Sequence, residues 1–189
     1  MARSTAPPLD RDRLIAAAFA QLEEDGLEGL SMRRLAARLG VQAPALYWHV
    51  ADKAELLGLM ARDIYAPAYA IAAAQDWRDW LLRFGQALRV TFAAHRDGAR
   101  LCASAPAPGV RDNANHADRI AAPLLALGLD RHRAVSFEAS VISFALGWAS
   151  FEANGSMHDY LDEMLNFDES FAIGLQSLVS GFPDPAANS

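Results

Sequence analysis

The sequence predicts an all-α fold, and three observations support this prediction. Hydrophobic residues make up 52% of the 189 residues, alanine is frequent and runs of β-branched residues are few, a composition that favours helices. Apolar residues recur at helical spacing along most of the chain. Aspartate or serine precedes several of these apolar segments and glycine follows them, so we expect a series of separate, capped helices.

Three helices are expected at the N-terminal end of the chain. The first covers about residues 10–25, where apolar side chains share one face and Gly26 follows. Ser31 can cap a second helix, which Gly40 can end in the left-handed conformation. Pro44 suits the first turn of a third helix of about two turns.

Longer helices are expected in the rest of the chain. Asp52 and Glu55 resemble a capping box that begins a helix running toward Tyr65, with Pro67 marking a kink or an end. The residues SAPAPGV are the best internal loop, because two prolines and a glycine cannot sustain a helix. The remaining helices are predicted at about 76–94, through 101–102, and at about 112–127, 130–154 and 168–180.

The segment of residues 31–53 carries polar groups that a purely structural hairpin does not need. It combines a helix, a tight turn and a short helix with Gln42, Tyr47, Trp48 and His49. Its positive side chains outnumber the single Asp52, although the whole chain has a net charge of -6. Phosphate contacts depend on the potential within about 8 Å, so this basic segment can bind DNA. The alternative is a solvated basic face on an ordinary helix hairpin.

Several segments resemble one known family. GLEGLSMRRLAARLGVQAPALYWHVADKAELL resembles the DNA-binding domain of the TetR family of bacterial regulators, and LYWHV is similar to the tetracycline repressors within it. DWRDWLLRFGQALRVTFAAHRDGARL and FAIGLQSLVSGF resemble the core and the last helix of those repressors. The resemblance implies a helix-turn-helix domain at residues 1–53 and a helical effector-binding and dimerisation domain at residues 54–189. It also implies a homodimer that binds a palindromic operator in double-stranded DNA and is released by a small molecule.

The DNA contacts follow from side-chain chemistry and from this resemblance. Arg33 offers a fork that suits guanine O6 and N7, and Gln42 could pair with adenine. Ala43 stands where the tetracycline repressors place a base-reading glutamine, and Ala45 lacks their phosphate-binding hydroxyl, so we expect a different operator. Trp48 either contacts phosphate or packs between the helices. The expected DNA-binding set is Ser31, Arg33, Gln42, Ala43, Pro44, Ala45, Tyr47, Trp48, His49 and Lys53.

The expected effector pocket departs from that of the tetracycline repressors. Cys102 stands at the place of their metal-binding histidine, and a neutral thiol is a poor Mg²⁺ ligand, so no metal or cofactor is expected. Their supporting glutamate aligns with Phe151, one place before Glu152. Tyr69, Phe84 and Leu88 replace polar drug contacts, which predicts a mostly apolar effector. The expected ligand-binding set is Tyr69, Phe84, Leu88, Cys102, His116 as a polar handle, Trp148 and Phe151.

The last helix carries an apolar stripe that the resemblance assigns to a four-helix bundle with a second copy of the chain. The alternative is a self-contained monomer core, because an apolar stripe by itself indicates only burial. The expected dimer-interface residues are Phe171, Gly174, Leu175 and Leu178.

Other function classes receive little support. No catalytic motif is visible, so an enzyme is not expected. MARSTAPP lacks the apolar region of a secretory signal, and the apolar region 134–151 is interrupted by polar residues, so we expect a cytoplasmic protein with no membrane span. The alternative functions are a tetracycline-responsive repressor and a small-molecule-binding protein with weakened DNA binding.

Overall fold

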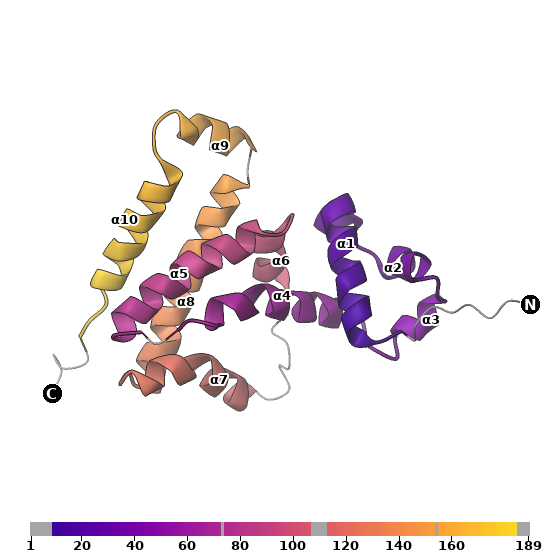
Figure 1. Cartoon of the computed structure of the whole chain (residues 1–189), viewed down its shortest axis with the longest axis horizontal. Coiled ribbons are helices and arrows are strands. Elements are labelled where there is room, and N and C mark those ends of the chain that lie inside the picture. The colour runs from indigo at the N-terminus through magenta and orange to yellow at the C-terminus, as the bar shows by residue number, and fades with distance from the viewer. Residues whose placement is uncertain (1–8, 73, 107–112, 154, 185–189) are drawn as a thin grey trace, which may run out of the picture.

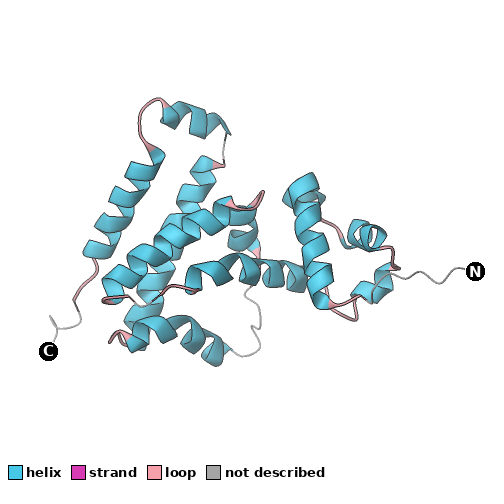
Figure 2. Cartoon of the chain, viewed as in Figure 1, coloured by secondary structure: helices cyan, strands magenta, loops and turns pink. Residues whose placement is uncertain are grey.

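The computed structural model describes residues 9–72, 74–106, 113–153 and 155–184. Every regular element within these ranges is a helix, which confirms the all-α prediction (Figures 1 and 2). The helices are α1 (Arg11–Gly29), α2 (Met32–Leu39), α3 (Ala43–Leu46), α4 (Lys53–Tyr69), α5 (Trp77–Ala93), α6 (Gly98–Ser104), α7 (Asn113–Ala126), α8 (Arg131–Glu152), α9 (Gly155–Asp162) and α10 (Phe167–Ser180).

The predicted caps set most helix starts. Each capping side chain accepts a hydrogen bond from the backbone N–H three residues later, which satisfies one of the free donors at a helix N-terminus. Five helices begin in this way at predicted caps, after Asp10, Ser31, Asp52, Asp76 and Asp130, and α10 begins in the same way after Asn166.

The structure differs from the sequence prediction at five places. Regular helical geometry breaks at Gly26, where φ is +70°, but α1 continues to Gly29. The third helix, α3, is a single turn of four residues instead of two turns. Helix α9 was not anticipated, and α10 is capped by Asn166. Pro67 lies within the last turn of α4 without ending it.

The helices form a small head and a larger core (Figure 1). Helices α1, α2 and α3 lie together at one end, and α4 runs from them into the core, where it packs against α5 and α6. Helices α5 and α8 form the most extensive helix pair of the core, α7 packs on α8, and α10 packs on both α5 and α8. The head and the core therefore share contacts with helix α4.

Helix α8 is long and apolar enough, by length and composition, to cross a membrane. A helix buried in the core of a protein meets the same two criteria. Within the chain α8 packs against α5, α7 and α10. Its buried apolar side chains, Ala134, Phe137, Val141, Ala145 and Ala149, thus have partners in the core, as in the buried helix that the sequence predicts.

Of the four residues expected at the dimer interface, Phe171 and Leu175 of α10 are buried within their own chain, whereas Gly174 and Leu178 are partly buried. Phe171 and Leu175 are 2% and 1% exposed. A Cβ atom at Gly85 of α5 would lie 2.7 Å from a methyl carbon of Leu175, so the leucine covers this glycine. Gly174 packs against the Phe144 ring, and Leu178 is partly buried against the same core. The helical periodicity of α10 correctly predicted that its apolar stripe is buried, but it did not show which helices would cover it.

Candidate DNA-binding surface and ligand cavity

The turn between α2 and α3 is built by Gly40 in the left-handed conformation, with φ of +69°. The N–H groups of Gly40 and Val41 donate to the carbonyl oxygens of Ala37 and Ala36 at 3.2 and 3.0 Å, and so close the end of α2. Leu46 of α3 is fully buried, and Val50 is nearly so. These two side chains fix the short α3 to the head and leave its opposite face open.

That open face carries the residues expected to contact DNA. Tyr47 is 51% and Trp48 is 88% exposed, so Trp48 does not pack between the helices. Gln42 and Pro44 are exposed, and His49 is partly buried, with its carbonyl oxygen accepting from Arg11. Three further members of the expected set, Ser31, Ala43 and Ala45, are partly buried, and Ser31 caps α2.

The basic residues of this segment fall into two groups. Arg34 pairs with Asp25 at 2.9 Å, and Arg38 forms a two-armed pair with Glu24, both acids lying on α1. Arg33 is exposed and Lys53 partly so, and within the described ranges neither forms an ion pair. Arg33 and Lys53 are therefore the two cations of residues 31–53 whose charge is not already balanced by the head.

A cavity of about 350 Å³ lies among α4, α6, α7 and α8. Of the residues expected to bind a ligand, the structure brings together Tyr69 and Cys102 on its wall. The sequence interpretation did not include the other wall residues, which are Ala61, Arg62, Tyr65, Ala66, Ala105, Pro106, Ile120 and Ile142. Most of these are small or apolar and gave no signal beyond helical periodicity.

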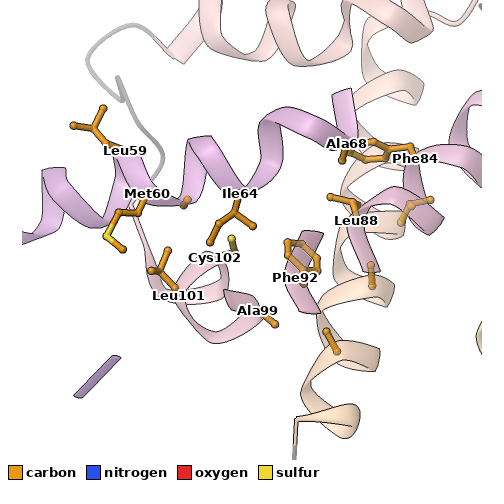
Figure 3. Packing of buried hydrophobic residues seen from close by; sticks show 14 of the residues in the cluster. Leu59, Met60, Ile64, Ala68, Phe84, Leu88, Phe92, Ala99, Leu101 and Cys102 are labelled. Carbon is orange, nitrogen blue, oxygen red and sulfur yellow. The ribbon is translucent and has the colours of Figure 1, made fainter. Parts of the chain in front are cut away.

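Four other expected ligand residues are not on this wall. Phe84 and Leu88 are fully buried on α5, where Figure 3 shows them among the apolar side chains of the core. Trp148 packs against Phe144 and the rings of α10, and Phe151 is exposed. The α5 periodicity correctly predicted that Phe84 and Leu88 face inward, but the described cavity wall is formed by α4, α6, α7 and α8 and includes no residue of α5. His116 lies in α7, and its side chain falls outside the described part of the structure.

One polar pair lies beside the apolar cavity. The Tyr69 hydroxyl donates to Oε1 of Glu138 on α8, and Glu138 is 1% exposed. Burial raises the pKa of Glu138 to about 7, although the Tyr69 hydrogen bond opposes this rise. Burial likewise raises the pKa of the Tyr69 hydroxyl, with the Glu138 charge adding to the effect. The sequence showed Glu138 only as a polar interruption in an apolar helix.

The raised pKa of Glu138 predicts a pH dependence of stability. Between about pH 4.5 and pH 7 the folded chain holds a proton on Glu138 that the unfolded chain releases. The free energy of unfolding should therefore fall as the pH rises through this window, by a Glu138 contribution on the order of 2 kcal/mol. Urea denaturation at pH 5 and pH 8 measures the fall, and Glu138→Gln should remove most of it. An equal fall in wild type and variant would contradict this origin.

Cys102 is a neutral thiol in this cavity. Burial raises its pKa to about 12, so the thiolate that binds metals is not formed near neutral pH. Mg²⁺ prefers oxygen ligands in octahedral geometry, which a thiol does not offer. Within the described residues no group of three His, Cys, Asp or Glu side chains could hold a metal ion.

The loop before α6 joins the cavity side of the core to the head. Asp97 has a φ of +56°, and its Oδ2 accepts the N–H of Leu27 at 2.8 Å, next to the kink at Gly26. The Arg96 side chain donates to the carbonyl oxygens of Glu23 and Glu24 of α1. His95 stacks on Phe19 and contacts the Glu23 carboxylate at 3.1 Å. Helix α6, which carries Cys102, is thus fixed to α1 at its N-terminal end.

Comparison with known proteins gives matches to both parts of the chain. Residues 14–60 match the family model of the bacterial regulatory proteins of the tetR family, and residues 72–163 match that of the tetracyclin repressor-like C-terminal domain. Tetracycline repressor protein class E from Escherichia coli is 30% identical, over 92% of this chain and 90% of that protein. The class A repressor of transposon 1721 from Escherichia coli is 42% identical over 49% of this chain, and the match spans 44% of its length.

Two solved structures are similar over nearly the whole chain. A TetR variant from Acinetobacter baumannii in complex with minocycline has 33% identity and a TM-score of 0.75, covering 93% of this chain and 97% of that one. BioQ with its double-stranded DNA operator has 31% identity and a TM-score of 0.70, covering 92% and 98%. With both family models matched and the class E repressor aligned over nine-tenths of each chain, this protein belongs to the TetR family of bacterial regulatory proteins.

Proposed function

We propose that this protein is a ligand-responsive transcriptional repressor that binds a palindromic operator as a homodimer and is released by a small, mostly apolar effector. The observation that carries the proposal is the exposed face of α3 with unpaired Arg33 beside it, joined through α4 to a core that holds an apolar cavity. The similar structures of BioQ with its operator and of the TetR variant with minocycline support DNA binding at one end and ligand binding at the other.

The proposed head comprises residues 1–53 and the proposed effector and dimerisation domain residues 54–189, a boundary at the start of α4. The exposed faces of α8 and α10 are the proposed dimer surface, which includes Ile173. Two heads about one DNA turn apart would read the two halves of a palindrome. A DNA-binding regulator acts where the DNA is, so we place the protein in the cytoplasm.

Arg33 is proposed to read a base, and Lys53 to neutralise a phosphate. Arg33→Ala should cost about 1–3 kcal/mol of operator binding and reduce the preference for the operator over unrelated DNA. Lys53→Ala should weaken binding to all sequences alike and reduce the slope of log affinity against log salt concentration by about one. Fluorescence anisotropy with operator and scrambled duplexes, at several salt concentrations, measures both effects.

Arg38→Ala provides a matched control, because the charge of Arg38 is paired with Glu24. It should change the salt slope less than Lys53→Ala does. The assignment is refuted if Arg33→Ala and Lys53→Ala reduce specificity equally. If wild-type protein binds no DNA from its own promoter region, the second candidate applies: a small-molecule-binding protein with weakened DNA binding, as Ala43 and Ala45 suggest.

A magnesium-bound tetracycline is less favoured as the effector than an apolar molecule. The cavity wall offers the neutral Cys102 thiol and apolar groups where a magnesium-bound drug needs oxygen or nitrogen ligands. Tetracycline with Mg²⁺ should therefore neither raise the melting temperature nor release the protein from DNA. Calorimetry with tetracycline, in Mg²⁺ and in EDTA, tests this: magnesium-dependent binding in the micromolar range or tighter would overturn the apolar-effector proposal.

A further inference from the structure

Arg62 of α4 is the one charged residue on the described wall of the cavity. The other wall residues are alanine, proline, isoleucine and tyrosine, together with the neutral thiol of Cys102. Ligand cavities of this kind are mostly apolar and use a small number of polar groups to orient the ligand. A wall with a single cation therefore favours a ligand that is apolar over most of its surface and carries one negative group.

The Arg62 guanidinium is accessible to such a group. The side chain lines the cavity and is 52% exposed, so its charged end lies at the solvent side of the wall. Nε and Nη2 donate to Oδ1 of Asp63, the next residue of α4, at 3.0 and 2.8 Å, and Nη1 has no hydrogen bond within the described ranges. An exposed ion pair contributes little free energy, so Asp63 does not prevent a second carboxylate from binding.

The wall residues of α4 give the cavity two different ends. Arg62 and Tyr69 are separated by about 10 Å along the helix axis, with Tyr65 between them. The Tyr69 hydroxyl already donates to Oε1 of the buried Glu138, so that end presents an aromatic ring whose donor is in use. A ligand with one terminal carboxylate would therefore lie with this group at Arg62 and its apolar end beside Tyr69.

We propose that the effector is an apolar molecule with one carboxylate, which Arg62 binds at the solvent side of the cavity while the apolar body lies against Tyr65, Tyr69 and Ile142. This inference rests on the proposed effector cavity and specifies its ligand class. The planar guanidinium matches a carboxylate with two parallel N–H groups, and such charged hydrogen bonds are stronger than neutral ones. The cavity, at about 350 Å³, suits a body of two fused rings or a short alkyl chain.

Two matched pairs of probes test the proposal. 2-Naphthoate and octanoate are charged at pH 8, whereas 2-naphthamide and octanamide have nearly the same shapes and are neutral. Calorimetric titration of the DNA-free protein at low salt should show that each acid binds about 5- to 10-fold more tightly than its amide. The preference should shrink as the salt concentration rises, because Arg62 is half-exposed.

Variants of α4 identify the group that recognises the carboxylate. Arg62→Gln should remove most of the preference for the acids and leave the affinities of the amides nearly unchanged. Asp63→Asn should have the opposite effect and strengthen binding of the acids about 2-fold or more, because the guanidinium then loses its competing carboxylate.

Arg83→Gln is the control for a change of net charge. Arg83 is also partly exposed and paired with an acid of its own helix, Asp79, but it is not on the cavity wall. This variant should keep the full preference for the acids. Equal affinities of acid and amide for the wild type, a preference that Arg62→Gln retains, or no binding of any probe would each overturn the proposal. Operator binding is measured separately, so amides that bind as tightly as acids, with operator binding intact, refute the ligand class and not the repressor function.

Discussion

Leu175→Asp is expected to unfold the core of this protein. Leu175 is buried on α10, where its methyl groups cover Gly85 of α5, and a methyl group of Val141 of α8 lies against the same glycine. An aspartate there buries a carboxylate among apolar groups and removes the packing between three helices. The free energy of unfolding should fall by about 4 kcal/mol or more. Urea denaturation followed by circular dichroism measures the loss, together with the recovery of soluble protein.

Ile173→Asp is the matched control on the same helix, because Ile173 is 60% exposed. It should leave the folded content unchanged. If the exposed face of α10 forms the dimer surface, Ile173→Asp should also give folded monomers in analytical ultracentrifugation. A Leu175→Asp variant that stays folded and loses only its dimeric state would restore Leu175 to the interface, contrary to its burial in the structure.

Asp97→Ala is expected to separate the head from the core. The Asp97 carboxylate accepts the Leu27 N–H, and Asp97 itself adopts a left-handed backbone that alanine tolerates poorly. The loss of a charged hydrogen bond and the backbone strain together should lower the free energy of unfolding by about 3 kcal/mol. Hydrogen exchange at the Leu27 amide should accelerate more than at amides in the middle of α5, since the opening is local.

Asp97→Asn separates the contributions to this effect. Asparagine adopts the left-handed conformation readily and keeps an oxygen that can accept from Leu27. It should retain most of the stability and most of the protection of the Leu27 amide. If Asp97→Asn is as damaging as Asp97→Ala, the negative charge matters more than the hydrogen bond. If neither variant changes exchange at Leu27, the contact does not hold the head to the core.

Local signals were sufficient to predict most of the helices. A capping side chain such as Asp76 or Asp130 acts on the backbone N–H three residues later, so its effect can be recognised without knowledge of the tertiary structure. The left-handed Gly40 is a local feature of the same kind. Helix α9 was missed because it is only eight residues long and has no long apolar stripe, and α3 was predicted too long because nothing local indicated an end after Leu46.

The composition of the candidate sites depends on which helices pack against one another. Helical periodicity in the sequence does not give this information. Phe84 and Leu175 were both recognised as inward-facing, yet Phe84 is core instead of cavity wall, and Leu175 packs in its own chain. The ion pairs of Arg34 and Arg38 could not be anticipated either, because their acidic partners lie on another helix. The family resemblance was recognisable from the sequence because the helix-turn-helix segment is short and continuous, and the family-model match to residues 14–60 confirms it.

The loop that fixes α6 to α1 bears on the construction of chimaeric regulators. A head transplanted from another family member would be joined covalently to this core through α4. It would also have to make the contacts that the loop before α6 makes with α1. Arg96 requires carbonyl oxygens where α1 bends, and Arg100 requires an acid at the place of Glu28. A sensor made by exchanging residues 1–53 alone could therefore bind its new operator and yet ignore its ligand. Transplanting residues 95–100 together with the head would keep the joint intact.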